Sequence, residues 1–251
     1  MNNYLNWKSQ TLTDFSPQSV SAAYAGGYVF TRLGKGLMQQ TRSVRIDLSK
    51  FAMTSENRRI LKKAGGLILQ RAELALKDYD YSLGKLAKDF YETKFGPGVM
   101  SAQKIKEMLT DAEKSNFNVL LTYSANPKVC DKEDLSEAVE AENEPSSSRT
   151  NGVSSESHTL GFAICYSNKD ILHYSYPFYD LKLAPKDMGL AMMTLAIQYA
   201  KEAGVKYVYL GSLQRPTDTY KLQFEGLEWF DGKAWKTDLD EVKKTLSSAK
   251  M

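Results

Sequence analysis

Apolar and polar positions change their spacing several times along the chain, and each spacing predicts a type of element. From Gly26 to Phe51 the apolar residues come in short groups typical of strands, at Tyr28-Val29-Phe30, Gly36-Leu37-Met38 and Val44–Leu48. Thr54 or Ser55 then reads as the N-cap of a helix that continues through Ala64, and Gly65-Gly66 end it. The first 25 residues are polar and weakly patterned.

The segment from residue 67 to residue 124 contains both the apolar runs typical of strands and the apolar spacing typical of helices. An apolar run predicts a strand at Leu67–Leu76, and helical spacing predicts a helix near 82–93. Ser101 has the position of a second helix N-cap, and Phe117–Tyr123 reads as a strand. Residues 125–157 are rich in Glu, Ser, Asn and Pro and nearly lack aromatics, which is typical of a mobile segment.

The last third of the chain has the most regular pattern. It predicts a hairpin of two strands, a long helix opened by Pro185 and stopped by Gly204, a strand, a short helix, and two final strands around the turn Asp231-Gly232. The expected ranges are Leu160–Ser167, Ile171–Tyr179, Pro185–Ala203, Val205–Leu210, 217–224 and Leu227–Phe230.

This order of elements predicts an α/β (α+β) fold of the GNAT acyltransferase type, with a mixed sheet that splays after its fourth strand. That strand is Ile171–Tyr179, and the acyl donor enters at the opening. We expect a smaller, basic N-terminal lobe at 1–66 that binds acceptor or tRNA. A transferase domain at 67–240 follows, with a mobile acidic insertion at 125–158. Fold alone does not decide function.

Composition narrows the class of protein. Hydrophobic residues make up 42% of the chain, enough for a real core, but no run approaches the roughly 20 apolar residues of a membrane span. The N-terminus has no apolar signal region, so we expect a cytoplasmic protein with no membrane partner. Cys130 and Cys165 are isolated, as are both histidines, so we expect no metal site and no cofactor. The motifs GxSxG, HExxH and the P-loop are absent from the sequence.

Charge is distributed unevenly although the net charge is only +3. Residues 126–160 hold eight acidic and three basic residues. The stretch from Arg32 to Arg71 carries ten Lys and Arg against Asp47 and Glu56. Such an excess suits a polyanion, although a solvated helix face beside a basic strand produces the same pattern.

Two blocks of sequence resemble one family, the arginyl-/leucyl-tRNA–protein transferases of the N-end rule pathway. Residues 27–63 are similar to its N-terminal block, with an Arg- and Gly-containing strand, then VRI, F and S-x-x-RR-x-L-K. Residues 178–211 and 219–236 are similar to its C-terminal block. They carry FYD, a long helix, YVYLG, a Y-K pair, a turn of the F-x-P-L-E kind and a D-G-x-x-W ending.

The chain departs from the family pattern at two places. The cysteine cluster that usually precedes the VRI strand is replaced by LMQQTRS at 37–43, which puts metal binding and acceptor specificity in question. The family's GYWI-x-x-C-x-K-M is replaced by GSLQRPTDT at 211–219, so donor or acceptor choice is expected to differ.

The resemblance implies an enzyme that moves an amino acid, Arg or Leu, from charged tRNA to the N-terminal α-amine of a protein, which marks that protein for degradation. Acceptors would begin with an acidic residue. Asp180, just past the splayed strand, is then the expected proton acceptor or amine-orienting group, although a loop residue that starts a turn explains it equally. Tyr176, Tyr179 and Tyr220 are expected to bind substrate, although an aromatic in that strand equally often faces the core. Arg45 is expected to meet the acidic side chain of the acceptor.

The tRNA contacts that the resemblance implies are basic. Lys221 of the Y-K pair and Arg215 would meet phosphates of the 3′ end, and the acceptor stem would lie on the basic helix. The residues expected to bind tRNA are Arg58, Arg59, Lys62, Lys63, Lys186, Arg215 and Lys221.

Two rival functions stay open from the sequence. Lys186 to Ala191 partly matches the Q/R-x-x-G-x-G/A loop at which CoA-dependent N-acetyltransferases bind the pyrophosphate, with Gly189 and Ala191 in place. The second rival is a non-catalytic tRNA- or degron-binding relative, since the cysteine cluster is missing.

Overall fold

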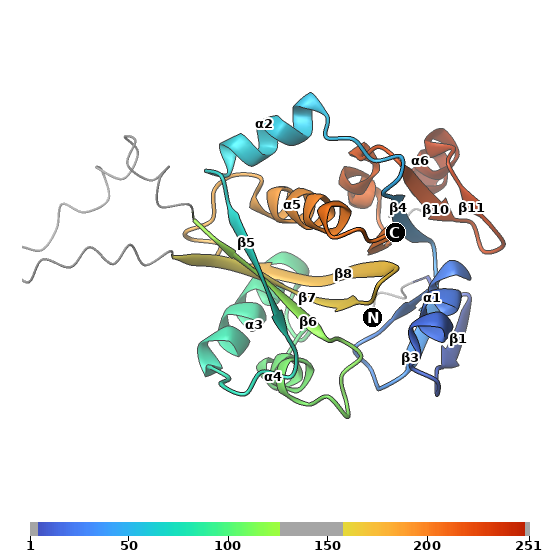
Figure 1. The fold of residues 1–251 in the computed structure, drawn as a ribbon. Coiled ribbons are helices and arrows are strands. Elements are labelled where there is room, and N and C mark those ends of the chain that lie inside the picture. The colour runs from blue at the N-terminus through green and yellow to red at the C-terminus, as the bar shows by residue number, and fades with distance from the viewer. Residues whose placement is uncertain (1–4, 126–157, 249–251) are drawn as a thin grey trace, which may run out of the picture.

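The computed structural model describes residues 5–125 and 158–248 and contains two β-sheets. A small sheet has the order β1-β3-β2, and a large sheet has the order β11-β10-β4-β9-β8-β7-β6-β5 (Figure 1). The strands are β1 (Lys8–Thr11), β2 (Tyr28–Phe30), β3 (Leu37–Gln40), β4 (Ser43–Asp47), β5 (Ile68–Glu73), β6 (Val119–Ser124), β7 (Thr159–Ser167), β8 (Ile171–Tyr179), β9 (Tyr207–Ser212), β10 (Leu227–Phe230) and β11 (Trp235–Lys236).

Helices cover both faces of the large sheet. Figure 1 shows α2 and α5 on one face and α3 and α4 on the other. The helices are α1 (Pro17–Ala25), α2 (Ser55–Lys63), α3 (Tyr81–Phe95), α4 (Ala102–Thr110), α5 (Met188–Glu202), the 3₁₀-helix η1 (Pro216–Gln223) and α6 (Leu239–Ser248). Within the described residues, no helix has the length and apolar content needed to cross a membrane.

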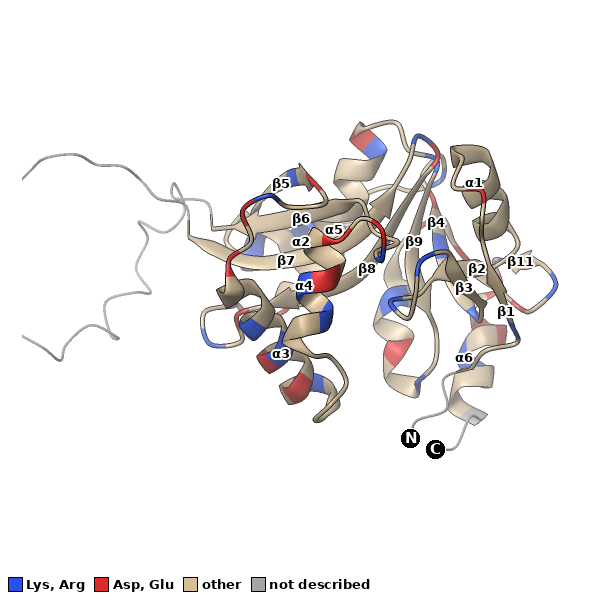
Figure 2. Cartoon of the chain, turned by 90° about the horizontal axis from the view of Figure 1, so that it is seen from below, with Lys and Arg blue, Asp and Glu red and all other residues tan. Residues whose placement is uncertain are grey.

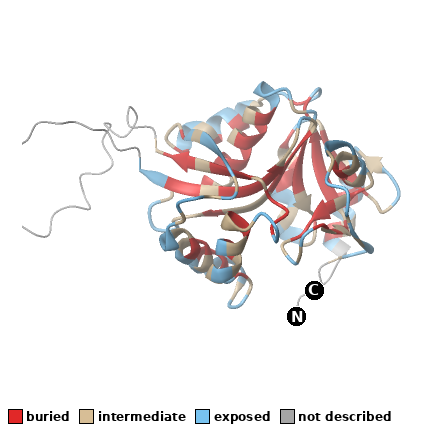
Figure 3. Ribbon diagram, turned by 60° about the horizontal axis from the view of Figure 1, so that its bottom comes forward, coloured by how far each residue is buried: buried red, intermediate tan, exposed pale blue. Residues whose placement is uncertain are grey.

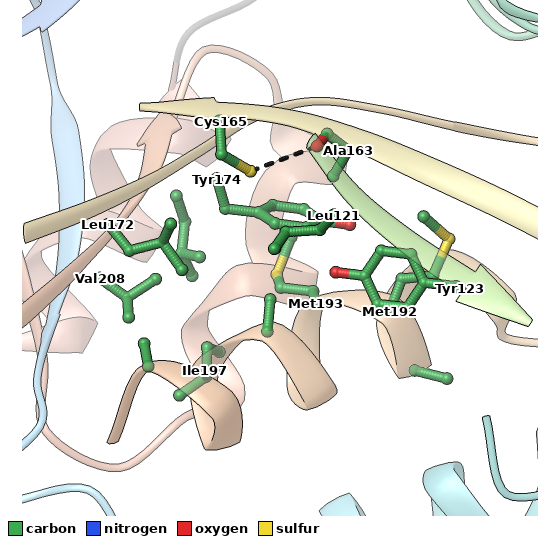
Figure 4. Packing of buried hydrophobic residues seen from close by; sticks show 14 of the residues in the cluster. Leu121, Tyr123, Ala163, Cys165, Leu172, Tyr174, Met192, Met193, Ile197 and Val208 are labelled. Carbon is green, nitrogen blue, oxygen red and sulfur yellow. Dashed lines mark hydrogen bonds between the residues drawn. The ribbon is translucent and has the colours of Figure 1, made fainter. Parts of the chain in front are cut away.

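The core is divided by the sheet. On one face α5 packs Met192, Met193 and Ile197 against Leu172, Tyr174 and Val208 of β8 and β9 (Figure 4). On the other face α1, α3 and α4 pack Tyr24, Phe90, Ile105 and other side chains against the sheet. Figure 3 shows the buried residues running along the strands, with exposed residues on outer helix turns and loops. Both faces of the central strands are therefore covered by side chains, and an opening between two of these strands is partly shielded from solvent.

The separation of β8 from β9 confirms the expected splay. The two strands pair in parallel from Ile171↔Tyr207 to His173↔Tyr209, and no further pair joins them, although β8 continues to Tyr179 and stays paired with β7 to its end. A bulge between Ile164 and Cys165 adds one residue to β8 at this point. The fold class is therefore the expected α+β fold with a large mixed sheet.

Local sequence signals placed most helix ends correctly. Thr54 caps α2 in a capping box with Asn57, and Ser101 caps α4 by accepting from Lys104 N. Gly65 and Gly66 have φ of 73° and 66°, which suits glycine after a helix.

The expected start of the long helix at Pro185 is wrong. Helix α5 begins at Met188, because Asp180 first closes a turn with Ala184 N donating to its carbonyl at 2.9 Å. Asp187, in the left-handed region with φ 67°, then forms the N-cap without a side-chain cap bond. Three elements were not expected from the sequence: β1 and α1 in the polar first 25 residues, and α6 at the C-terminal end.

The first 66 residues contribute to both sheets. Strand β4 lies between β10 and β9 in the large sheet, while β1, β2 and β3 form the small sheet. The division at residue 66 stays a prediction, but a lobe at 1–66 would share β4 with the transferase domain. Most of the acidic insertion at 125–158 lies outside the described residues.

Candidate functional site

A cleft of about 960 Å³ opens where β8 and β9 separate. Its walls come from β2 and the turn after it, the C-terminal half of α3, the free half of β8, the start of α5, the end of β9, and η1. The splayed strands thus place the ends of several elements around one space, at the opening expected for an acyl donor.

The β8 wall carries two of the expected tyrosines. The ring of Tyr176 packs edge-on against Phe117, with centroids 5.2 Å apart, and burial raises the pKa of its hydroxyl. The ring of Tyr179 packs against Phe90 at 4.7 Å, and burial also raises its pKa. Both line the cleft, and their role in binding substrate stays a prediction.

The start of α5 forms a wall in which the first N–H groups of the helix have partners within the protein. The backbone N–H groups of Met188, Leu190 and Ala191 donate to carbonyls of Pro185 and Asp187, and the Gly189 N–H donates to the Tyr179 hydroxyl. A Cβ added to Gly189 would lie 3.4 Å from the Tyr179 ring. That is an ordinary van der Waals distance, so packing does not require a glycine here. The first N–H groups of the helix, at residues 188–191, are nevertheless engaged within the protein.

Lys221 of η1 lies inside the cleft wall instead of on a solvated helix face. Its residue is only 9% exposed, and Nζ donates to the carbonyl of Ser212 at 2.9 Å. Burial lowers the pKa of Lys221, since removing a cation from water disfavours its charged form, and the nearby Arg215 acts in the same direction. The negative charge of Asp218 opposes them. A buried amine with a lowered pKa is suited to proton transfer.

Tyr220 and Arg215 lie at the mouth of the cleft. Tyr220 is 46% exposed, and burial of its hydroxyl, with the charge of Asp218, raises its pKa to about 12. The Arg215 guanidinium lies 5.2 Å from the ring centroid of Phe95, which is 45% exposed. This edge therefore pairs exposed aromatic rings with cations, an arrangement that suits single-stranded nucleic acid.

His173 is a site residue that sequence reasoning missed. It belongs to the last pair between β8 and β9, is 2% exposed, and lines the cleft. Its Nδ1 lies 2.9 Å from the hydroxyl of Tyr24, which accepts from Phe30 N at 3.3 Å. The hydroxyl proton is then free to go to Nδ1, which leaves the proton of the neutral ring on Nε2. Burial, with the charge of Lys221, lowers the pKa of His173 to about 3.

Asp180 is not brought into the cleft lining. Its Oδ1 accepts from the backbone N–H groups of Lys182 at 2.8 Å and Leu183 at 3.3 Å, so the carboxylate closes the turn after β8. This is the turn-starting role that the sequence left open. A role for Asp180 as proton acceptor stays a prediction that this geometry does not support.

Arg45 is buried away from the cleft and has its own carboxylate. It pairs with Glu228 at 2.7 Å, bonds to the Tyr209 hydroxyl at 3.3 Å, and lies between the rings of Tyr207 and Trp235 at 4.1 and 4.0 Å. With its charge neutralised and its faces covered, Arg45 is not positioned to meet a substrate. The expected contact with an acidic acceptor side chain is not supported by this geometry.

The basic residues of α2 lie outside the cleft but close to its α5 wall. Arg58, Arg59, Lys62 and Lys63 are exposed, and Arg59 pairs with Glu56 and lies near enough to Asp187 to feel its charge. Lys186 is exposed just before α5. By contrast, Figure 2 shows blue and red segments mixed along α3 and α4, so α2 is the more basic face.

No group of three His, Cys, Asp or Glu suited to a metal ion occurs in the described residues. Cys165 is buried, which raises the pKa of its thiol to about 12, and a hydrogen bond from the Ser175 N–H only partly offsets this. Cys130 lies outside the described residues.

A sequence model of the family described as "Arginine-tRNA-protein transferase, C terminus" matches residues 100–231, more than half of the chain. The chain belongs to this family. The matched part begins in the loop between α3 and α4 and ends just after β10. It therefore includes the parts of the cleft wall that come from β8, the start of α5, β9 and η1. The resemblance expected from the sequence is thereby confirmed.

Three curated proteins that resemble this chain have the same name, aspartate/glutamate leucyltransferase. The aspartate/glutamate leucyltransferase of Dinoroseobacter shibae is 26% identical over 196 residues, covering 77% of this chain and 61% of the relative. That of Methylorubrum populi is 27% identical over 203 residues, covering 77% and 70%. That of Ruegeria pomeroyi is 36% identical over 83 residues, covering 32% and 30%. The chain thus spans 61% of the length of the first of these relatives.

Solved structures resemble the transferase-family chain only distantly. L-PGS from Bacillus licheniformis has a TM-score of 0.45 at 13% identity, covering 91% of this chain and 68% of that one. FemX has a TM-score of 0.44 at 14% identity, covering 79% and 60%. Likeness at this level carries no conclusion about substrates.

Proposed function

We propose that this protein is an aminoacyl-tRNA–protein transferase, which moves leucine or arginine from charged tRNA to the N-terminal α-amine of proteins. The observation that carries the proposal is Lys221: a buried amine in the cleft at the splay, on a segment that the family match covers. The names of the relatives favour leucine, and acceptors that begin with Asp or Glu. In the cytoplasm, where charged tRNA is available, such a tag would mark the acceptor for degradation.

The reaction needs no external reagent. The neutral amine attacks the ester carbonyl carbon, a peptide bond forms, the bond between that carbon and the ribose oxygen breaks, and the ribose hydroxyl leaves with the proton that the amine lost. Holding amine and ester together supplies up to roughly 7–11 kcal/mol of the barrier. A group that carries the proton adds about 10²–10⁴-fold.

Lys221 is the cleft residue best suited to carry that proton. Because burial lowers its pKa, its neutral form is more accessible than that of an exposed lysine. Neutral Lys221 accepts a proton from the attacking amine and returns it to the leaving ribose oxygen. The Ser212 carbonyl, which accepts from Nζ at 2.9 Å, fixes the position of the amine.

The donor side chain has an apolar wall available. Leu190 and Met193 of α5, Leu210 of β9 and Phe90 of α3 line the cleft. An uncharged leucyl group is compatible with this wall, while an arginyl group would bring a charge against it. This wall supports leucine as the donor.

The tRNA body is proposed to lie over α2. The exposed cations Lys62 and Lys63 would meet acceptor-stem phosphates, and Lys186 and Arg215 would meet the 3′ end as it enters the cleft. Phosphate contacts of this kind set affinity and its salt dependence.

A transfer assay with a total tRNA pool, charged with a mixture of radiolabelled amino acids, tests the proposal and identifies the donor. We expect label on a peptide with a free N-terminal Asp or Glu and none on the same peptide with an acetylated N-terminus. Absence of label with every amino acid and every acceptor would exclude the transferase function.

The CoA-dependent alternative has less support. The N–H groups of residues 188–191 are engaged within the protein, and Asp187 adds a negative charge where a pyrophosphate would bind. We expect millimolar acetyl-CoA to leave the melting temperature unchanged, whereas a bound ligand at a hundredfold excess over Kd adds about 2.7 kcal/mol.

A further inference from the structure

Arg32 is a cleft cation whose function the mechanism above does not use. It follows β2, lines the cleft and is half-buried. One Nη atom donates to the carbonyl of Val99 at 2.9 Å, and the guanidinium also bonds to the hydroxyl of Tyr176, whose ring centroid is 6.0 Å away. Two neutral acceptors therefore fix the orientation of this side chain.

Within residues 5–125 and 158–248, the charge of Arg32 has no neutralising partner. Among the described residues, no carboxylate lies within ion-pair distance of it, in contrast to Arg45 and Arg59. The two carboxylates that line the cleft belong to Asp187 and Asp218, and Asp218 already accepts from the backbone N–H groups of Gln214 and Arg215 at 2.7 and 2.9 Å. A guanidinium has five N–H donors, so Arg32 retains several for a ligand.

The other cations of the cleft differ from Arg32 in position. Lys221 is buried on η1 and is held by the Ser212 carbonyl. Lys94 is exposed at the rim, and Arg215 lies against the Phe95 ring at the mouth. Arg32 and Arg215 are both half-buried and both carry the planar fork that binds a carboxylate through two parallel bonds. They differ in position, because Arg215 lies against the Phe95 ring at the mouth, while Arg32 is oriented by the Val99 carbonyl and the Tyr176 hydroxyl.

We propose that Arg32 is the specificity-determining residue that binds the side-chain carboxylate of the acceptor's N-terminal Asp or Glu. This inference rests on the proposed function, since it names the residue that reads the acceptor. With its carboxylate on Arg32 beside Tyr176, the acceptor residue would lie within the same cleft as Lys221. A neutral Asn or Gln side chain cannot form the two charge-assisted hydrogen bonds that a carboxylate forms with Arg32. A Lys or Arg side chain is repelled by the charge of Arg32.

Arg32→Met and Arg32→Lys test this role against Lys94→Met, a matched loss of a cation at the rim. Peptides that begin with Asp, Asn, Glu and Gln are compared, because each pair differs almost only in charge. We expect the wild type and Lys94→Met to prefer Asp over Asn by about ten- to hundredfold in kcat/KM, mainly through KM. Arg32→Met should lose this preference, and Arg32→Lys should keep part of it because it retains the charge without the fork.

Peptide binding without tRNA separates this inference from the proposed function. Calorimetric titration should show tighter binding of the Asp peptide than the Asn peptide by the wild type, and equal binding by Arg32→Met, even if no transfer occurs. Equal binding and transfer of both peptides by the wild type would overturn the inference. So would an Arg32→Met protein that keeps its Asp preference but binds tRNA more weakly with a smaller salt dependence, since Arg32 would then contact a phosphate.

Discussion

At the scale of single residues, burial decides which charged groups can act on a substrate. Arg45 and Arg32 are both arginines near strands of the N-terminal region, and the sequence favoured Arg45 because of its place in the VRI strand. The structure pairs Arg45 with Glu228, 183 residues away, and leaves Arg32 without a carboxylate among the described residues. A pairing across that separation depends on the register of β4 and β10, which a single sequence does not reveal.

The sequence indicated some residues of the cleft and missed others. Tyr176, Tyr179, Tyr220, Arg215 and Lys221 all line the cleft. Tyr179, Tyr220 and Lys221 lie in the C-terminal motif block and the other two lie outside it, and the binding roles of all five stay predictions. The burial of Lys221 was not foreseen, because it results from η1 folding against the end of β9. His173 gave no signal, since an isolated histidine in a strand belongs to no motif.

His173 gives the folded state a pH dependence that can be measured. Histidine has a pKa near 6.5 in an unfolded chain, and burial lowers that of His173 to about 3. Below about pH 6.5 the unfolded chain therefore binds a proton that the folded chain does not, and stability falls as the pH drops from about 6.5 to about 3. At about 1.4 kcal/mol per unit, the loss is at most about 5 kcal/mol. Above pH 6.5 this residue adds no dependence.

Urea unfolding at a series of pH values measures this effect. His173→Gln should flatten the pH dependence relative to the wild type, and His158→Gln, which alters the exposed histidine, should not. Identical curves for His173→Gln and the wild type below pH 6.5 would show that His173 is protonated in the folded protein.

At the scale of elements, the strand and helix order follows from local pattern, and the exceptions have tertiary causes. Strand β8 has the expected bounds, Ile171–Tyr179, because alternating apolar residues and the Asn168-Lys169-Asp170 turn define both ends. Strand β1 has a mostly exposed pattern and depends on pairing with β3, so its own residues do not predict it. Helix α5 starts later than Pro185 suggests because the turn at Asp180 uses the residues before it.

Helix α2 should contribute to tRNA affinity through charge alone. Lys62→Gln with Lys63→Gln removes two exposed cations and leaves the buried Ile60 and the capping box in place. We expect weaker tRNA binding and a slope of log K against log salt that is smaller by about 1.5, at roughly 0.7–0.9 per phosphate contact. Electrophoretic or fluorescence titrations at several salt concentrations measure both.

The control for this experiment is the double variant Lys169→Gln with Lys233→Gln. It removes the same charge from two exposed loops that do not line the cleft. An equal change of slope in both double variants would mean that α2 attracts tRNA only through net charge.

Gly27 joins the two sheets at a point where no side chain fits. Its φ is 80°, and a Cβ there would lie 2.2 Å from the ring of Phe230 at the end of β10. Gly27→Ala should destabilise the fold by about 3 kcal/mol, from the left-handed backbone and the clash together. Gly204→Ala has a similar φ of 74° with open space around it, and should cost only about 1 kcal/mol.

Chemical denaturation of both glycine variants separates backbone strain from packing. Equal losses would mean that the Phe230 ring moves aside freely and that the contact between the sheets is not tight.

At the scale of the whole molecule, the splay joins regions that are distant in sequence. The small sheet supplies Arg32 and the large sheet supplies β8 and β9, while α5 and η1 close the remaining sides of one cleft. The splay itself was expected because the order of elements matches the GNAT fold, in which the sheet splays after its fourth strand. Which side chains face the resulting space depends on how the two sheets pack, and it required the structure.

The most direct test of this account is transfer from purified leucyl-tRNA to a peptide that begins with Asp, analysed by mass spectrometry. The wild type and Lys233→Met, which removes an exposed loop lysine, should add one leucyl residue to the N-terminus. Lys221→Met should fold normally and bind tRNA, but it should transfer at a rate lower by about 10²–10⁴-fold. An unmodified peptide with the wild type would contradict the proposed transferase function. Equal rates for Lys221→Met and the wild type would show that the buried lysine does not carry the proton.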